Sequence, residues 1–166
     1  MFSDWGSALK RLTGLVFRGP FVQRDAEVLE LDDCADLPHS FVHPDFVPAN
    51  AIGTDEDKLV IVDWTGSGRG PRLWSLGFLL WAAGMRSPKL VDVVVSRYRR
   101  HCQLTELELA RLAGAIKARP LLIDCWSVAH GRKTADEVAA SLPFLDRHAE
   151  RIAGLATAAF RAPETT

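Results

Sequence analysis

A length of 166 residues suits a single compact domain. A hydrophobic share of 48% with a charged share of 25% is typical of a globular protein. The net charge of −1 provides no electrostatic basis for binding nucleic acid or an acidic membrane surface. The most apolar stretch, 73–85, is shorter than the ~20 residues that cross a bilayer. The first residues, MFSDWGSALKRL, lack the basic and apolar segments of a signal peptide. We therefore expect a cytoplasmic protein with no membrane or nucleic-acid partner.

The first forty residues predict helical or irregular structure. Trp5, Leu9, Leu12 and Val16 keep helical spacing, which predicts a helix over 5–17 that stops before the Gly-Pro pair at 19–20. The stretch 24–31 is a second, shorter helix candidate. Cys34, the first of three widely spaced cysteines, forms no CxxC pair with Cys102 or Cys125. We expect all three to be reduced and mostly buried.

The middle of the chain predicts a β-hairpin. Two prolines exclude a regular helix over 40–50. The segments 51–53 and 58–62 then read as strands around a polar turn at 54–57. Antiparallel pairing would bring Asn50 and Asp63, the residues that flank these strands, to the same open end of the hairpin.

A glycine-rich stretch, GSGRG at 66–70, follows the hairpin. It lacks the G-x-G-x-x-G spacing of a phosphate-binding loop, so we interpret it as a turn from strand to helix. The next segment, 73–85, is apolar on nearly all sides and predicts a buried helix. Gly77 and Gly84 would allow close packing against it.

The remainder predicts helices. One is expected over 88–101. Thr105 and Glu108 have the spacing of a capping box, as do Thr134 and Glu137, and each pair predicts a helix start. We expect the Arg-Pro pair at 119–120 to break a helix, a further helix to continue to Gly131, and Pro143 to open the last helix.

Asp45, Asn50 and Asp63 are the residues with the clearest chemistry. Carboxylate and amide oxygens are the ligands that Mg²⁺ prefers, and a loop carboxylate such as Asp45 can accept a proton from a hydroxyl. Phosphoryl transfer needs a base, a metal and in-line positioning. Each residue taken alone also suits an ordinary turn or cap, so the hypothesis depends on the three converging.

The segment HPDFVPAN, from His43 to Asn50, resembles the HGDxxxxN catalytic loop of aminoglycoside phosphotransferases and of related choline and homoserine kinases. VDWTGSGRGP, at 62–71, is similar to their metal-binding segment, and the likeness extends over about 41–160. The resemblance implies the C-terminal lobe of a protein-kinase-like fold, α+β and mainly helical. It implies that Asp45 is the catalytic base with His43 beside it, that Asn50 and Asp63 bind Mg²⁺ and thereby ATP, and that a small-molecule hydroxyl, on a cationic acceptor in some of these enzymes, receives the phosphate. Asp92, Asp124 and Asp136 are examples of acidic residues that could face such a cation, but they are scattered over helices whose orientation the sequence does not determine.

The resemblance implies a division into a segment 1–40, a lobe 41–160 and a tail 161–166. The lobe would contain the catalytic loop 41–50, the metal segment 59–70 and the helical part 73–160. Two positions depart from the pattern. Pro44 replaces the glycine between His43 and Asp45, and Ser75 stands where the family has an acidic residue that braces the loop.

No strand lysine paired with a helix glutamate is evident in the sequence, so we expect the nucleotide-binding N-terminal lobe to be missing. Three interpretations stay open: a truncated kinase, a lobe completed by a second chain or dimer mate, and a non-catalytic binding module. Without that lobe we also expect apolar residues near Phe41 to be exposed.

Overall fold

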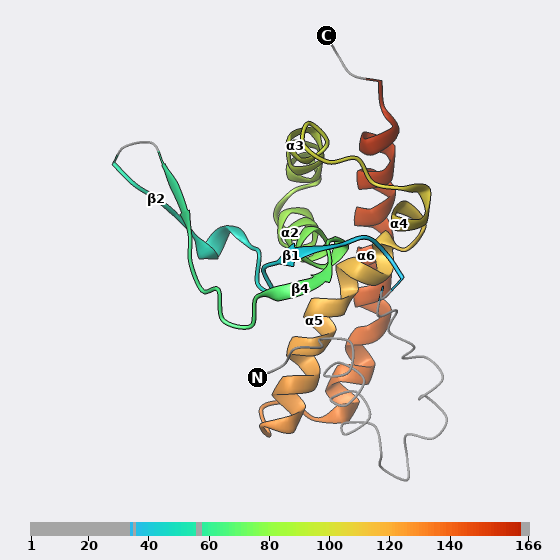
Figure 1. Ribbon diagram of the computed structural model, residues 1–166. Coiled ribbons are helices and arrows are strands. Elements are labelled where there is room, and N and C mark those ends of the chain that lie inside the picture. Colours follow the sequence, from blue (N-terminus) through green and yellow to red (C-terminus); the bar gives the residue numbers. More distant parts are fainter. Residues whose placement is uncertain (1–33, 35, 56–57, 164–166) are drawn as a thin grey trace.

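The computed structural model describes residues 34, 36–55 and 58–163; the helices expected over 5–17 and 24–31 lie outside them. The described part is mainly helical, with two short antiparallel strand pairs on one side (Figure 1), which confirms the predicted α+β class. Its elements in chain order are β1 (His39–Val42), a 3₁₀ turn (Pro48–Asn50), β2 (Ala51–Gly53), β3 (Leu59–Ile61), β4 (Gly68–Pro71), α2 (Leu73–Arg86), α3 (Pro88–Tyr98), α4 (Glu106–Ala110), α5 (Leu112–Ala129) and α6 (Ala135–Arg161).

Helix α2 lies inside the helical body, in contact with α3, α5 and α6. Its glycines set how closely those helices approach. A β-carbon at Gly77 would lie 2.6 Å from the carbonyl oxygen of Ala115 in α5, and one at Gly84 would lie 2.5 Å from the Ile152 side chain in α6. The expectation that both glycines permit close packing is therefore confirmed.

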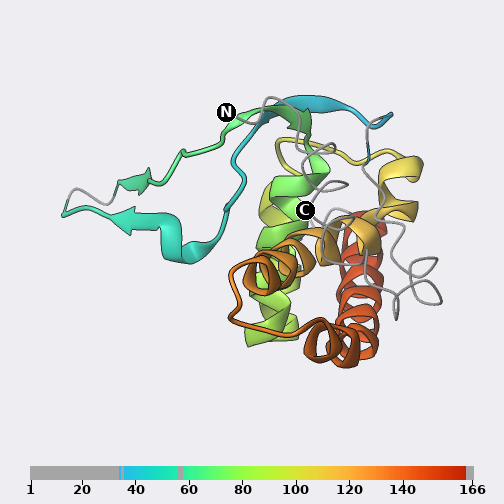
Figure 2. The same ribbon diagram turned by 90° about the horizontal axis from the view of Figure 1, so that it is seen from below.

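The β2–β3 hairpin forms as predicted, with Ala51 opposite Ile61 and Gly53 opposite Leu59. It extends away from the helical body (Figure 2). The glycine-rich stretch differs from the prediction, because only 65–67 turns and Gly68–Pro71 forms β4, which pairs with His39–Val42. Glycine has low strand propensity, and the pairing joins segments far apart in sequence, so no local pattern indicated it.

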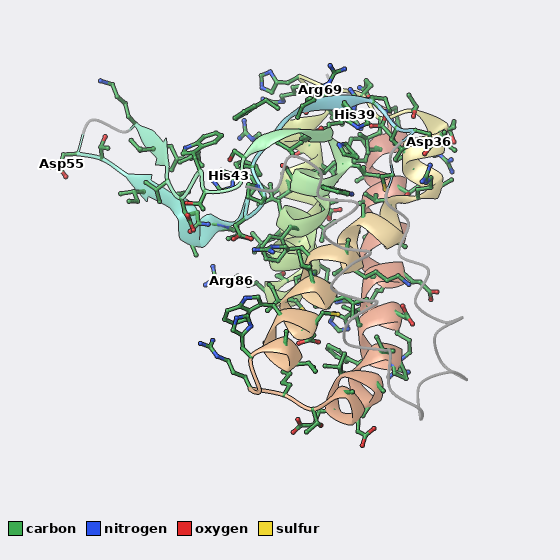
Figure 3. The ribbon with its side chains drawn as sticks, turned by 60° about the horizontal axis from the view of Figure 1, so that its bottom comes forward. Asp36, His39, His43, Asp55, Arg69 and Arg86 are labelled. Atoms are coloured by element: carbon green, nitrogen blue, oxygen red, sulfur yellow. The ribbon has the colours of Figure 1, made fainter. Side chains whose placement is uncertain are left out.

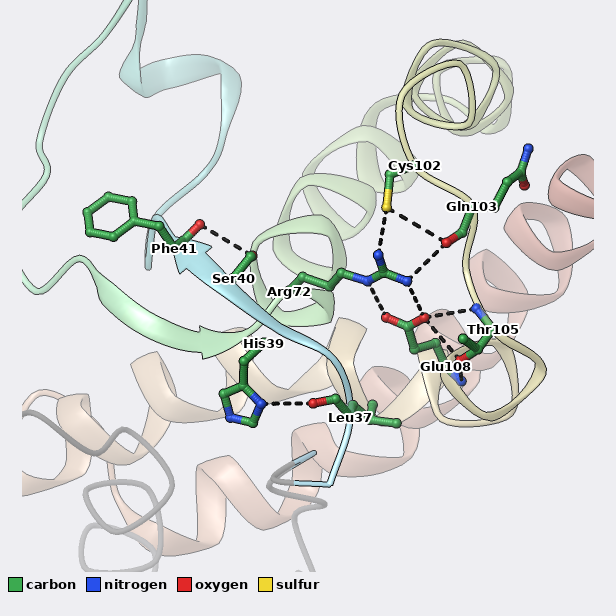
Figure 4. Close-up of polar contacts among 9 residues, drawn as sticks. All are labelled: Leu37, His39, Ser40, Phe41, Arg72, Cys102, Gln103, Thr105 and Glu108. Atoms are coloured by element: carbon green, nitrogen blue, oxygen red, sulfur yellow. Dashed lines mark hydrogen bonds and ion pairs between the residues drawn. The ribbon is translucent and has the colours of Figure 1, made fainter.

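Arg72 and Glu108 join the strands to the helices (Figure 4). Arg72 follows β4, and its guanidinium donates two hydrogen bonds of 2.7 Å to the fully buried carboxylate of Glu108. Glu108 also accepts from the Thr105 N–H at 2.8 Å, which completes the predicted capping box of α4. Burial raises the pKa of Glu108, but the hydrogen bonds from Arg72 and Thr105 outweigh it and the pKa is lowered.

Two predictions at proline are wrong, the helix break at Pro120 and the helix start at Pro143. Pro120 lies inside α5 and Pro143 inside α6, which begins at the Thr134–Glu137 capping box instead. A proline removes one helical hydrogen bond, but buried apolar residues on both sides of Pro120, such as Ile116 and Leu121, keep α5 packed in the core. The break comes earlier, at Arg111 between α4 and α5, and α3 ends at Tyr98 rather than at residue 101.

No disulfide joins the three cysteines, as expected, and Cys34 and Cys125 are buried while Cys102 is half-buried. Burial, together with the neighbouring Asp124, raises the pKa of Cys125 to about 11, so this thiol is unreactive at neutral pH. No helix in the described part of the chain is long and apolar enough to cross a membrane.

The glycine contacts predict opposite effects of the same substitution at two sites. Gly77→Ala is expected to lower the free energy of unfolding by about 1–3 kcal/mol, because the methyl group meets the backbone of α5. Gly154→Ala is the matched control in α6, where a β-carbon meets nothing within 4 Å, and it is expected to raise stability by about 0.5–1 kcal/mol. Urea unfolding of both variants measures this, and equal effects would contradict the packing described.

Candidate active site

The His43 imidazole is the centre of the catalytic loop. It is buried, and its Nε2 lies 2.9 Å from the carbonyl oxygen of Val62, while its Nδ1 lies 3.1 Å from the backbone nitrogen of Asp45. Because the Asp45 N–H can only donate, Nδ1 accepts and Nε2–H donates, which defines the neutral tautomer. His43 thus ties the loop to the end of the hairpin, as Figure 3 shows by its position between hairpin and helices.

Ser75, in the first turn of α2, holds the backbone of the same residue. Its hydroxyl accepts from the His43 N–H at 3.0 Å and donates to the His43 carbonyl at 2.8 Å. An ionised carboxylate at this position can accept from the N–H but cannot donate to the carbonyl. The serine therefore satisfies both main-chain groups of His43.

Trp64, directly after Asp63, covers the histidine. Its ring meets the His43 ring edge-on at a centroid distance of 4.7 Å, and its indole N–H donates to the Ile61 carbonyl at 2.7 Å. Phe41 stacks on the outer face of Trp64 at 5.9 Å. Both aromatic rings remain largely exposed, so this layer shields His43 on one side and meets solvent on the other.

The structure brings Asp45 and Asn50 together. The Asn50 side-chain N–H donates to the main-chain carbonyl of Asp45 at 2.9 Å. The main-chain carbonyl of Asn50 accepts from the Val62 N–H at 2.9 Å. The first bond orients the amide so that its oxygen is the end that can ligate a cation. Asn50 therefore links the base, the 3₁₀ turn and the hairpin, and its amide oxygen suits Mg²⁺.

Asp63 lies one residue beyond Val62, at the same end of the hairpin as Asn50. Its backbone is left-handed, with φ 59°, a conformation that costs most side chains free energy but that Asp and Asn tolerate. Its side chain is exposed, and among the described residues no hydrogen bond or ion pair joins its carboxylate to Asp45 or Asn50. Asp45 and Asn50 are therefore joined by a hydrogen bond, whereas Asp63 lies at the same end of the hairpin without a contact to either of them.

Arg119, in α5, is a site residue that the sequence reasoning missed. Its guanidinium forms an ion pair with the Asp45 carboxylate and lies 5.9 Å from the centroid of the Phe78 ring. Arg119 is one of two charged residues, with Lys117, in the otherwise apolar stretch 112–123, and the proline that follows it is typical of a helix break rather than of a site residue. In the observed state the ion pair occupies one oxygen of the proposed base.

A small cavity of about 40 Å³ lies behind the loop, lined by residues that include His43, Pro44, Trp74 and Arg119. Pro44 forms part of its wall, so the proline that replaces the family's glycine fits this loop without disrupting the hydrogen bonds of His43. The Trp74 indole N–H is buried and has no partner among the described residues.

The Asp45–Arg119 pair is testable by a double-mutant cycle. We expect Asp45→Asn and Arg119→Met to show a coupling of about 0.5–1 kcal/mol in thermal unfolding, because both side chains are partly shielded from water. The Glu106–Arg161 pair is the control, since both of its side chains are mostly exposed, and there we expect no coupling outside experimental error. Equal coupling in the two cycles would argue against a shielded contact at Asp45.

Comparison with known proteins gives the family. The model of the phosphotransferase enzyme family (APH) matches residues 7–115. This match begins further toward the N-terminus than the resemblance seen in the sequence, and it ends within α5. Searches of curated proteins and of solved structures found no significant match. Because the family model covers more than half of the chain, and includes the loop and hairpin described above, the chain belongs to the phosphotransferase enzyme family.

Proposed function

We propose that this chain provides the catalytic-loop lobe, 41–160, of a phosphotransferase that transfers a phosphoryl group from ATP to the hydroxyl of a small molecule. The observation that supports this most is the hydrogen-bonded loop. His43 binds both the Asp45 backbone and Val62, and Asn50 binds the same two residues from the other side. The proposed base, Asp45, and the candidate metal ligand, Asn50, are thus held by the same hydrogen bonds at the open end of the hairpin.

Asp45 is the proposed base, and it would accept the proton of the acceptor hydroxyl. Its ion pair with Arg119 fixes the carboxylate in place, so the hydroxyl has to approach the oxygen that Arg119 leaves open. His43 acts as a positioning residue, because both of its ring nitrogens are already used to hold the loop.

Asn50 and Asp63 are the proposed ligands of Mg²⁺. The residues fit the ion, since the Asn50 amide presents its oxygen and the Asp63 carboxylate is exposed. When bound, the ion would neutralise charge on the phosphates of ATP. Asp63 would be drawn into the site from an exposed position, whereas Asn50 is already held.

The residues that bind the phosphates of ATP are proposed to lie outside the described part of the chain or on a second chain. The described lysines, Lys58, Lys89, Lys117 and Lys133, lie on the hairpin turn, on helices or in loops, and none lies within a strand. The alternative is a non-catalytic binding module that kept the loop architecture.

Magnesium-dependent nucleotide binding tests the proposal. We expect calorimetry on the purified chain to show ATP binding that requires Mg²⁺ and that weakens at least ~10-fold in Asp63→Asn, since the amide lacks the charge that holds the ion. Asparagine also tolerates the left-handed backbone of residue 63, so the variant changes charge rather than fold.

Asp92→Asn on α3 removes the same charge outside the site and serves as the control. Binding that is equal with and without Mg²⁺, or equal in wild type and Asp63→Asn, would contradict the metal assignment. No binding by the wild-type chain would contradict a complete nucleotide site within this chain and would favour either a nucleotide-binding partner chain or the binding module.

We further propose that a second copy of the chain covers the exposed face of the hairpin. Phe41 is 68% exposed and Leu59 66% exposed. Ile52 and Val60, which lie opposite each other in the hairpin, and the neighbouring Trp64 are exposed as well. Exposed apolar surface of this kind is typical of interaction sites.

Light scattering during size exclusion checks this surface. We expect the wild-type chain to run as a dimer and Phe41→Ser/Leu59→Ser to run as a monomer. Val93→Ser, which changes an equally exposed apolar residue on α3, is expected to remain a dimer. A monomeric wild type would refute self-association through this surface.

A further inference from the structure

A groove of about 530 Å³ lies between α2, α5 and α6, apart from the hydrogen-bonded loop. Its walls include Phe78, Trp81 and Met85 from α2, Ile123 from α5 and Phe144 from α6. The volume falls within the range of about 300–1,000 Å³ found for small-molecule sites, which are concave and mostly apolar with a few polar groups. The groove therefore has the size and composition of a ligand site.

Three side chains around this groove expose apolar surface that the fold leaves uncovered. Met85 and Phe144 are each 47% exposed, and Ile123 is 41% exposed. They come from three different helices and meet at one hollow. Scattered apolar residues on a surface need no explanation, but residues that gather around a concave site indicate a ligand that covers them.

The groove is connected to the proposed base by a single side chain. Phe78 forms part of the groove wall, and the Arg119 guanidinium lies 5.9 Å from its ring centroid while it is paired with Asp45. Pro120, the next residue of α5, also lines the groove. The Arg119 guanidinium thus lies near both the Phe78 ring, at this end of the groove, and the Asp45 carboxylate.

The charges of the groove argue against a cationic ligand. Asp124 is the one ionisable residue among the residues that line it, and its carboxylate is already paired with Lys133. A second polar group, the Ser141 hydroxyl, donates to the Val138 carbonyl at 2.8 Å and keeps its oxygen as an acceptor. The lining therefore offers aromatic faces and one hydroxyl, with no unpaired carboxylate for an ammonium group.

We propose that this groove binds an uncharged alcohol with an apolar, ring-containing body, and that this alcohol is the phosphoryl acceptor. The ring would lie against Phe78, Trp81 and Phe144, where offset or edge-on contacts are favourable. The hydroxyl would lie at the Phe78 end, beside Arg119 and Asp45. The role as acceptor rests on the proposed function, whereas the binding itself does not.

Ligand-observed NMR with 2-(2-naphthyl)ethanol as the probe tests the site on the full chain. We expect saturable binding with a dissociation constant below about 1 mM. Ile123→Glu places a charge in the groove, and Phe144→Ser removes a ring from its wall. Each is expected to weaken binding at least ~10-fold. Val93→Glu is the matched control, because it introduces the same charge at an exposed apolar position on α3, and it is expected to bind as the wild type does.

Choline and glycerol are the comparison ligands, and both are expected to bind at least ~10-fold more weakly than the naphthyl alcohol. Absence of saturable binding, equal weakening in Val93→Glu, or tighter binding of choline would overturn the proposal. Asp63→Asn separates the two hypotheses, since it is expected to lose Mg²⁺-dependent nucleotide binding and to keep the naphthyl alcohol. A wild-type chain that binds the alcohol but no nucleotide would support the groove as a ligand site and overturn its role as an acceptor site.

Discussion

The ion pair between Arg72 and Glu108 is the contact on which the rest of the arrangement depends. Arg72 stands at the junction of β4 and α2, and its backbone N–H also donates to the Pro38 carbonyl, just before β1. Glu108 is fully buried and closes the capping box of α4. Removing either partner would leave the other charge without its counter-ion, which is far more costly than losing an exposed pair. The lowered pKa of Glu108 keeps the pair charged at neutral pH, so its stabilisation is present above the ordinary carboxyl range and is lost only as the pH falls through the lowered value.

This anchor fixes the start of α2, and the start of α2 fixes the catalytic loop. Ser75 lies three residues after Arg72 and holds both main-chain groups of His43, while His43 in turn holds Asp45 and Val62. The first turn of α2, followed by the hydrogen bonds of Ser75 and His43, thus connects the Arg72–Glu108 ion pair to the proposed base. Precise positioning of reacting groups provides much of the catalysis in phosphoryl transfer. The polar contacts described here therefore position residues rather than react, since only Asp45 would contact a substrate.

Local patterns in the sequence predicted what local interactions determine. The hairpin, both capping boxes and the two close glycine contacts of α2 followed from spacing and residue type. The β1–β4 pairing, the double hydrogen bond of Ser75 and the ion pair of Arg119 each join residues 26 or more positions apart, so no short window contained them. The two predictions at proline were wrong because they too depended on local sequence alone. Proline at 120 and at 143 disfavours a helix locally, yet burial of the neighbouring turns against other helices decides the outcome.

The two halves of the site differ in how firmly they are held. Asp45 and Asn50 are tied to each other, and Asp45 is tied to α5 by Arg119. Asp63 has none of these contacts, and it lies in a left-handed conformation at the base of an exposed hairpin. Left-handed backbone at a non-glycine residue costs free energy that surrounding contacts usually offset, and here the described contacts of the side chain do not. If Asp63 and Asn50 hold a cation as proposed, the Asp63 carboxylate would gain the contact that folding alone does not give it. On this view the base half is built by folding, whereas the metal half is completed only when its ligand arrives.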